Sequence, residues 1–378
     1  MNPNTKKLHA LGQRIWLDNI TRELLQNGTL ARCIAELSVT GLTSNPTIFE
    51  HAIGSGTGYD EAIRQLSSRG LSGEGLFFEL ALQDLRQAAD LFRPVFDASA
   101  GADGWASLEV SPLLAHDADG TIRHAAQLHA QAARPNLFIK IPGTPAGVVA
   151  IEESIFGGVP INVTLLFSRE HYVAAADAYL RGMERRVQAG LDPQVTSVAS
   201  LFVSRWDVAV KEKTSPPLHN RLGIAIAMRT YKAYRDLLAS ERWQKLARAG
   251  ARPQRLLWAS TGTKDPAAPD TLYVDALADP TPSIPFPTKP CWPLPTMAMQ
   301  ARSCRLTVAR AKPCLRNSGA KALTTKRLPH VCNAKGCRRL PSPGRLYWHG
   351  SRTKPFKRSD GKPHPSSGGP NGTAFFTY

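Results

Sequence analysis

Cysteine is nearly absent from most of this 378-residue chain. Only Cys33 precedes residue 280, whereas the other five cysteines follow it, at positions 291, 304, 314, 332 and 337. A long segment with a single cysteine is typical of a reducing compartment and is unlike a secreted scaffold held by disulfides. The front of the chain is therefore predicted to fold without disulfides, in the cytoplasm.

Long apolar runs are also lacking. No apolar stretch is long enough to span a bilayer, and Lys6 and Lys7 are not followed by the apolar segment that a secretory signal needs. We therefore expect no membrane partner.

Acidic residues are nearly absent from the C-terminal segment. Residues 280–378 contain 18 Lys and Arg but one acidic residue, Asp360, whereas residues 1–279 contain 29 of each sign. The formal net charge of +17 therefore belongs wholly to the tail, which also carries 15 of the 29 prolines. Because proline breaks helices and removes a donor from a sheet, we predict two parts: a folded domain over residues 1–279 and a basic, proline-rich, disordered tail over residues 280–378.

One stretch of the front segment stands out chemically. Residues 136–144 (NLFIKIPGT) form a continuous apolar run that carries Lys140 and then breaks at Pro142 and Gly143. The run is typical of a strand buried on both faces, as in a parallel sheet, that ends in a turn. A lysine there either reaches water at an edge or is desolvated, and desolvation favours the neutral amine that attacks carbonyl groups.

Strands of this kind alternate with helical patterns along the front segment. Alternation predicts βαβ units around a parallel sheet. The arrangement that gathers many strand ends around one pocket is the (β/α)8 TIM barrel. An open doubly wound sheet is the alternative, but no glycine-rich dinucleotide turn follows the first strand. Seven strands are expected, at residues 15–19, 39–46, 105–112, 136–144, 159–168, 197–205 and 255–261.

Polar or reactive residues occupy the ends of these strands, so a barrel would bring them to one mouth. Together they fit Schiff-base cleavage and transfer of a ketose fragment. In this interpretation Lys140 attacks the carbonyl, Glu109 moves protons through water, and Asp18 takes the proton of the hydroxyl at the breaking bond. A guanidinium suits phosphate, which gives Arg205 that role with Ser200 beside it. The remaining strand-end residues, predicted to hold sugar hydroxyls and water, are Asn45, Asn162 and Thr164.

Four segments resemble the transaldolase family, in its longer bacterial and plant-type branch. They are residues 43–49 (TSNPTIF), 136–142 (NLFIKIP), 161–168 (INVTLLFS) and 258–264 (WASTGTK). The resemblance covers about residues 11–279. It implies a class I aldolase-type barrel of the cytoplasmic pentose phosphate pathway that uses no metal and no cofactor. It also implies that the substrates are sugar phosphates: sedoheptulose 7-phosphate and glyceraldehyde 3-phosphate give erythrose 4-phosphate and fructose 6-phosphate.

The resemblance also implies roles for individual residues. Lys140 matches the Schiff-base lysine, Glu109 and Asp18 the proton-transfer residues, and Thr164 the residue that holds water. The matches expected to bind substrate are Asn45, Asn162, Ser200, Phe202, Arg205 and Lys264. We expect either a monomer or a homodimer.

The resemblance stops near residue 280, where prolines replace the pattern of an eighth strand and closing helices. The sequence therefore predicts a barrel whose eighth strand is missing or disrupted. Charge, cysteine, proline and periodicity all change at this point, which suggests a reading-frame shift in the gene or in its sequencing. A catalytically inactive product is the alternative to a working transaldolase.

Two other interpretations of the tail remain open. A basic arm can bind nucleic acid through counterion release, although no recognition motif is present, so we expect no nucleic-acid partner. A zinc site formed by His330, Cys332, Cys337 and His349 is the other, although the spacing of the two cysteines is poor.

Overall fold

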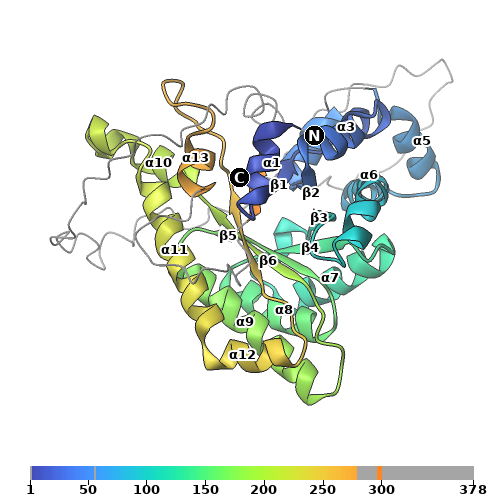
Figure 1. Ribbon diagram of the computed structural model, residues 1–378. Helices are drawn as coiled ribbons and strands as arrows, with labels where there is room; N and C mark the ends of the chain where they lie inside the picture. The colour runs from blue at the N-terminus through green and yellow to red at the C-terminus, as the bar shows by residue number, and fades with distance from the viewer. Residues whose placement is uncertain (1, 55–56, 279–295, 300–378) are drawn as a thin grey trace. The chain divides into compact units, whose positions relative to one another are not determined.

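The computed structural model describes residues 2–54, 57–278 and 296–299. Its eight strands are all parallel and pair in sequence order into a closed barrel, with β1 beside β8 (Figure 1). The strands are β1 Arg14–Asp18, β2 Val39–Thr43, β3 Trp105–Glu109, β4 Leu137–Pro142, β5 Ile161–Leu166, β6 Ser197–Phe202, β7 Arg255–Ala259 and β8 Thr296–Met299. The predicted (β/α)8 barrel and its seven strands are therefore confirmed.

Helices follow the strands and cover the barrel. Two of them begin at side chains that cap the helix: Ser168 Oγ accepts from the backbone N–H of His171 at the start of α9, and Thr144 Oγ1 accepts from that of Gly147 in α8. The helices are α1 Pro3–Ala10, α2 Arg22–Gln26, α3 Thr29–Leu37, α4 Pro46–Gly54, α5 Asp60–Ser68, α6 Gly73–Ala98, α7 Ala118–Ala132, α8 Pro145–Phe156, α9 Arg169–Gln188, α10 Ser204–Val210, α11 Leu222–Ala239, α12 Glu241–Arg248 and α13 Leu272–Ala278. Three short 3₁₀ helices are η1 Pro112–Leu114, η2 Lys211–Lys213 and η3 Pro216–Leu218.

The eighth strand is present but short. The prolines after residue 280 predicted an eighth strand that is missing or disrupted. The structure has a strand of four residues there, which begins at Thr296, directly after Pro295, and contains no proline. Thr296 pairs with Arg14 of β1 and with Leu257 of β7, so the backbone ladder closes. β8 is nevertheless shorter than the other strands, which have five or six residues. The predicted absence of closing helices, the disordered tail and the zinc ligands lie outside the described residues.

The barrel interior is layered. Trp16, Trp105 and Phe138, here called the aromatic floor, stack with ring centroids 4.0 Å apart for Trp105–Phe138 and 6.0 Å for Trp16–Phe138. Side chains alternate along a strand, so Lys140 points into the barrel one layer above Phe138. Gly41 lies against the floor, where a Cβ atom would come within 2.5 Å of the Trp16 ring. The floor therefore separates the strand-end residues from the other end of the barrel.

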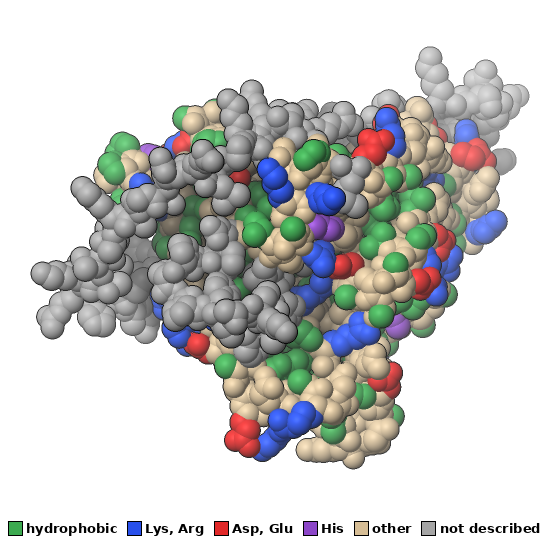
Figure 2. Space-filling view, viewed as in Figure 1, with side chains coloured by type: hydrophobic (Ala, Val, Ile, Leu, Met, Phe, Trp, Pro, Cys, Tyr) green, Lys and Arg blue, Asp and Glu red, His purple; other side chains and the backbone are tan. Residues whose placement is uncertain are grey.

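The described surface carries charges of both signs. On the face in Figure 2, Lys and Arg side chains lie among Asp and Glu side chains, as expected from the charge balance of residues 1–279. No helix within the described residues is long and apolar enough to cross a membrane.

Candidate active site

The side chain of Lys140 lies buried at the C-terminal end of β4. Its Nζ lies 3.1 Å from Oε2 of Glu109 and donates a hydrogen bond to the carbonyl oxygen of Ser44 at 2.9 Å. The strand register places Glu109 of β3 and Asn162 of β5 directly beside Lys140. Both members of the ion pair are only 7% exposed at the side chain, so a proton can pass between them with little competition from bulk water.

Asp18 lies at the end of β1 and is partly exposed at the mouth. Burial raises the pKa of its carboxyl above the ordinary value, because the charged form loses hydration. The positive charges of Lys140, Lys264 and Arg205 oppose that shift of the Asp18 pKa, and the negative charge of Glu109 adds to it. The structure therefore brings these five sequence-predicted residues within electrostatic reach of one another.

Asn162 is held by two serines, an arrangement here called the Asn162 clamp. Ser200 Oγ donates to Asn162 Oδ1 at 2.7 Å, and Asn162 Nδ2 donates to Ser107 Oγ at 3.1 Å. All three side chains are buried, and they come from β3, β5 and β6. Ser107 was not predicted, although it lies two residues before Glu109 and therefore faces the same side of β3. The clamp fixes the orientation of the amide and leaves Asn162 one further N–H for a substrate.

Thr164 lies two residues after Asn162, on the same face of β5. It is buried, and its Oγ1 makes no hydrogen bond to a described residue. The register between β5 and β6 shifts directly after Val163, and Leu165 adopts a positive φ of 57°. Such a conformation is uncommon for a residue with a Cβ, so the strand departs from regular geometry where Thr164 enters the site.

Two further cations, Arg205 and Lys264, follow the C-terminal ends of β6 and β7. The Arg205 guanidinium lies over the Phe202 ring, 4.8 Å from its centroid, and Phe202 contacts Phe167 at 5.3 Å between centroids. Arg205 in α10 and Lys264 after β7 are exposed and can reach an anion in solvent. Ser200, predicted to lie beside Arg205, has its hydroxyl directed at Asn162 instead.

Asn45 occupies the turn between β2 and α4. Its Oδ1 accepts from the backbone N–H of Ile48 at 2.9 Å, so this oxygen caps α4. The amide N–H groups are the part of Asn45 that can bind a sugar hydroxyl. The neighbouring Ser44 was not predicted as a site residue, since its contribution is a backbone carbonyl, which no sequence pattern identifies.

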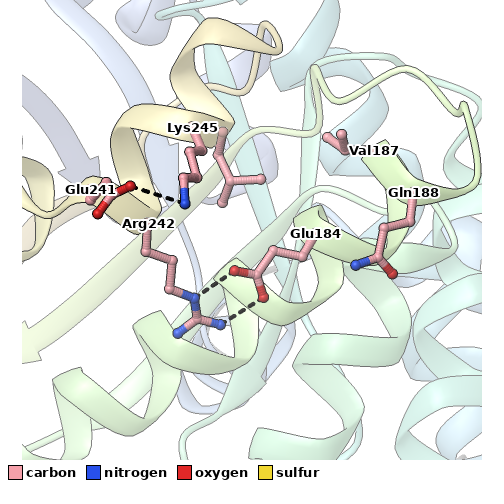
Figure 3. A pocket seen from close by; sticks show the side chains of 7 residues that line it. Glu184, Val187, Gln188, Glu241, Arg242 and Lys245 are labelled. Carbon is pink, nitrogen blue, oxygen red and sulfur yellow. Dashed lines mark hydrogen bonds and ion pairs between the residues drawn. The ribbon is translucent and has the colours of Figure 1, made fainter.

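A separate hollow of about 460 Å³ lies on the outside of the barrel, between α9 and α12 (Figure 3). Its charged residues are already paired, Arg242 with Glu184 at 2.6 Å and Lys245 with Glu241 at 3.0 Å. It is lined by Glu184, Val187, Gln188, Glu241, Arg242, Lys245 and Leu246. The groups suited to chemistry lie at the barrel mouth. Nowhere in the described part of the chain do three or more His, Cys, Asp or Glu side chains gather as metal ligands.

Known proteins match the chain over the barrel. The family described as Transaldolase/Fructose-6-phosphate aldolase matches residues 15–281. Transaldolase 1 of Streptomyces avermitilis is 47% identical over 285 residues, which cover 73% of this chain and 75% of the relative. A transaldolase of Thermobifida fusca is 46% identical over 288 residues, covering 74% and 78%. One of Renibacterium salmoninarum is 44% identical over 288 residues, covering 74% and 77%. The resemblance predicted for about residues 11–279 is confirmed.

Proposed function

The chain belongs to the transaldolase family, and we propose that it transfers a dihydroxyacetone unit between sugar phosphates through a Schiff base on Lys140. The observation that carries the residue assignment is the buried contact between Lys140 Nζ and Glu109 Oε2 at 3.1 Å. A lysine that loses its proton to an adjacent carboxylate becomes a nucleophile at neutral pH. No other lysine of the described residues is buried against a carboxylate.

In the first half-reaction, the neutral Lys140 amine attacks C2 of the donor ketose and forms a carbinolamine. Glu109, acting through water, delivers a proton to the leaving hydroxyl, and loss of water gives a protonated imine. Thr164 is suited to orient that water, since its buried hydroxyl has no described partner.

Asp18 then removes the proton from the C4 hydroxyl. The C3–C4 bond breaks, its electron pair moves into the protonated imine, and the donor leaves as a shortened aldehyde. The raised pKa of Asp18 suits this role, because a base of higher pKa accepts a proton more readily. What remains on Lys140 is an enamine, which attacks the acceptor aldehyde in the reverse sense.

The substrate phosphate is assigned to Arg205 and Lys264, the two exposed cations on the side of the mouth formed after β6 and β7. Guanidinium binds a phosphate through two parallel N–H donors. Asn45 and Asn162 are assigned to the hydroxyls of the dihydroxyacetone unit. We propose a cytoplasmic enzyme that acts as a monomer or a homodimer.

Borohydride trapping tests the proposal. Incubation with fructose 6-phosphate and borohydride should leave a reduced dihydroxyacetone adduct on the peptide that contains Lys140, read by mass spectrometry. Lys140→Met should give no adduct, whereas Lys232→Met, which changes an exposed lysine of α11, should be labelled like the unchanged chain. An adduct on another lysine, or none at all, would contradict the assignment.

A further inference from the structure

Asp207 is a buried carboxylate outside the groups that touch the substrate. It lies in α10, and it accepts hydrogen bonds from the backbone N–H groups of Leu222 at 2.9 Å and Gly223 at 3.2 Å. The Tyr273 hydroxyl donates to the same carboxylate at 2.8 Å. One side chain therefore joins α10 to the start of α11 and to α13, which lie near one another in Figure 1.

Asp207 accepts hydrogen bonds from backbone groups that α11 cannot satisfy itself. The first N–H groups of a helix have no acceptor within it, and Arg221 at the start of α11 provides no side-chain cap. Asp207 supplies the acceptor from another helix. The approach requires glycine, because a Cβ at Gly223 would lie 2.4 Å from the Val203 carbonyl oxygen. Burial raises the pKa of Tyr273 well above the ordinary value, so its hydroxyl stays protonated and donates.

The same short helix carries Arg205. α10 has seven residues, and helices of that length are not stable by themselves in water. Its direction is set by tertiary contacts: Asp207 on one side and Trp206 Nε1, which donates to the Phe167 carbonyl oxygen at 2.6 Å, on the other. The guanidinium of Arg205 therefore depends on these contacts for its place over Phe202.

The loop that carries Lys264 is attached to the same elements. Asp265 accepts from Asn220 Nδ2 at 3.1 Å and lies 3.5 Å from Lys211 Nζ. Asn220, which has a φ of 58°, lies just before α11, and Lys211 directly follows α10. A shift of α10 relative to α11 would thus move both cations of the phosphate side.

We propose that Asp207 is a positioning residue that determines the preference for phosphorylated substrates, by fixing α10, α11 and α13 so that Arg205 and Lys264 present a preorganised pair of cations to a phosphate dianion. This proposal rests on the assignment of Arg205 and Lys264 to the phosphate. The carboxylate works through the helices and does not touch the substrate. Its loss should weaken phosphate binding more than the chemistry at Lys140.

The test compares fructose 6-phosphate with unphosphorylated fructose as the donor. Asp207→Asn keeps the shape but replaces one acceptor oxygen with a donor, so KM for fructose 6-phosphate should rise about tenfold, in keeping with one lost charge-assisted hydrogen bond. The kcat/KM for fructose should stay within about twofold. Asp236→Asn, an exposed change in α11, should alter neither value. The proposal would be overturned if Asp207→Asn lowered kcat/KM equally for fructose 6-phosphate and fructose, or lowered neither.

Tyr273→Phe keeps the carboxylate and serves if Asp207→Asn does not fold. It should raise KM for fructose 6-phosphate two- to fivefold, in the same direction, because the carboxylate loses one hydrogen bond and keeps those from the backbone of Leu222 and Gly223. Calorimetry with inorganic phosphate gives a readout that is independent of Schiff-base chemistry: Asp207→Asn should weaken phosphate binding and Asp236→Asn should not. If the unchanged chain binds phosphate but forms no adduct on Lys140, the proposed reaction fails while the proposed role of Asp207 can still be decided.

Discussion

Ser200 donates its hydroxyl hydrogen to Oδ1 of Asn162 at 2.7 Å, and both side chains are buried beneath the barrel mouth. The hydroxyl that the sequence assigned to the phosphate therefore orients an amide next to Lys140. Asn162 is adjacent to Lys140 in the strand register. A change in the orientation of its amide should therefore disturb a substrate held on Lys140.

Ser200→Ala should accordingly lower activity on phosphorylated and unphosphorylated donors alike. The change leaves the buried Asn162 oxygen without its donor, which costs about 1–3 kcal/mol. We expect kcat/KM to fall roughly 10- to 100-fold for both sugars. Steady-state kinetics with fructose 6-phosphate and fructose check this. A loss confined to the phosphorylated sugar would instead place Ser200 on the phosphate side, as the sequence suggested.

Glu109→Gln tests whether Glu109 transfers protons in the reaction or only pairs with Lys140. Glutamine keeps the shape and a hydrogen-bond acceptor near Lys140 but cannot accept the proton of Nζ. Loss of a general acid or base typically costs ~10²–10⁴-fold in rate, so trapping of the Lys140 adduct should slow by that order. Rapid-quench borohydride trapping measures the rate, with Glu79→Gln, at a partly exposed ion pair of α6, as the control. Trapping at the original rate would remove Glu109 from the mechanism.

Asp18 predicts a pH dependence of activity. Because burial raises its pKa, the proton-accepting form is lost at a higher pH than for an ordinary aspartate. The acid limb of the kcat profile should therefore lie above about pH 4, the ordinary range of Asp. Asp18→Asn should abolish that limb and lower kcat ~10²–10⁴-fold. A limb below the ordinary range would contradict the assignment.

The raised pKa of Asp18 also determines whether this residue stabilises or destabilises the fold as pH rises. An aspartate with a raised pKa in the folded state binds more protons folded than unfolded, so its contribution to stability falls as pH rises from the unfolded to the folded pKa. Above that window the ionised Asp18, whose carboxylate has lost hydration in the folded state, opposes folding. Asp18→Asn should thus leave stability at pH 7 unchanged or higher while activity is lost. Thermal unfolding at pH 4 and pH 7 measures this, and a destabilised variant at pH 7 would be the opposite result.

Asp103 links the two strands that pair with the short β8. Its two carboxylate oxygens bind Arg14 Nε of β1 at 2.8 Å and Arg255 of β7 at 3.1 Å, the two strands that flank β8. Asp103→Ala should lower the free energy of unfolding by about 1–3 kcal/mol, since two partly buried guanidinium groups lose an acceptor. Asp97→Ala, which breaks an exposed pair with Arg93, should cost less than about 1 kcal/mol. If denaturant titrations give the same loss of unfolding free energy for both variants, Asp103 does not stabilise the strands around β8.

The change in composition at residue 280 leads to a prediction about the coding sequence. If the reading frame shifts there, translation of the DNA in another frame should restore a strand followed by amphipathic helices. The intact mass of the expressed chain reports whether residues 280–378, with their 18 basic residues, are present. If neither alternative frame gives such a pattern, the frameshift hypothesis is wrong.

The sequence by itself determined the barrel, its seven strands and the family. Each strand is a local apolar run that ends in polar residues, and Lys140 and Glu109 could be found because they stand at matching ends of such runs. The sequence predicted an eighth strand that is missing or disrupted because the prolines before β8 dominate the local pattern. The pairing of the short β8 depends on β1 and β7, which lie far away in the chain.

Tertiary structure decided which atoms each side chain uses. The Ser200 hydroxyl meets Asn162 across 38 positions of the chain, Lys140 meets the Ser44 carbonyl across 96, and Asp207 meets Tyr273 across 66. A residue type limits what a side chain can donate or accept. The partner, however, is chosen by strand register and helix packing, which bring together groups that no local pattern of sequence connects.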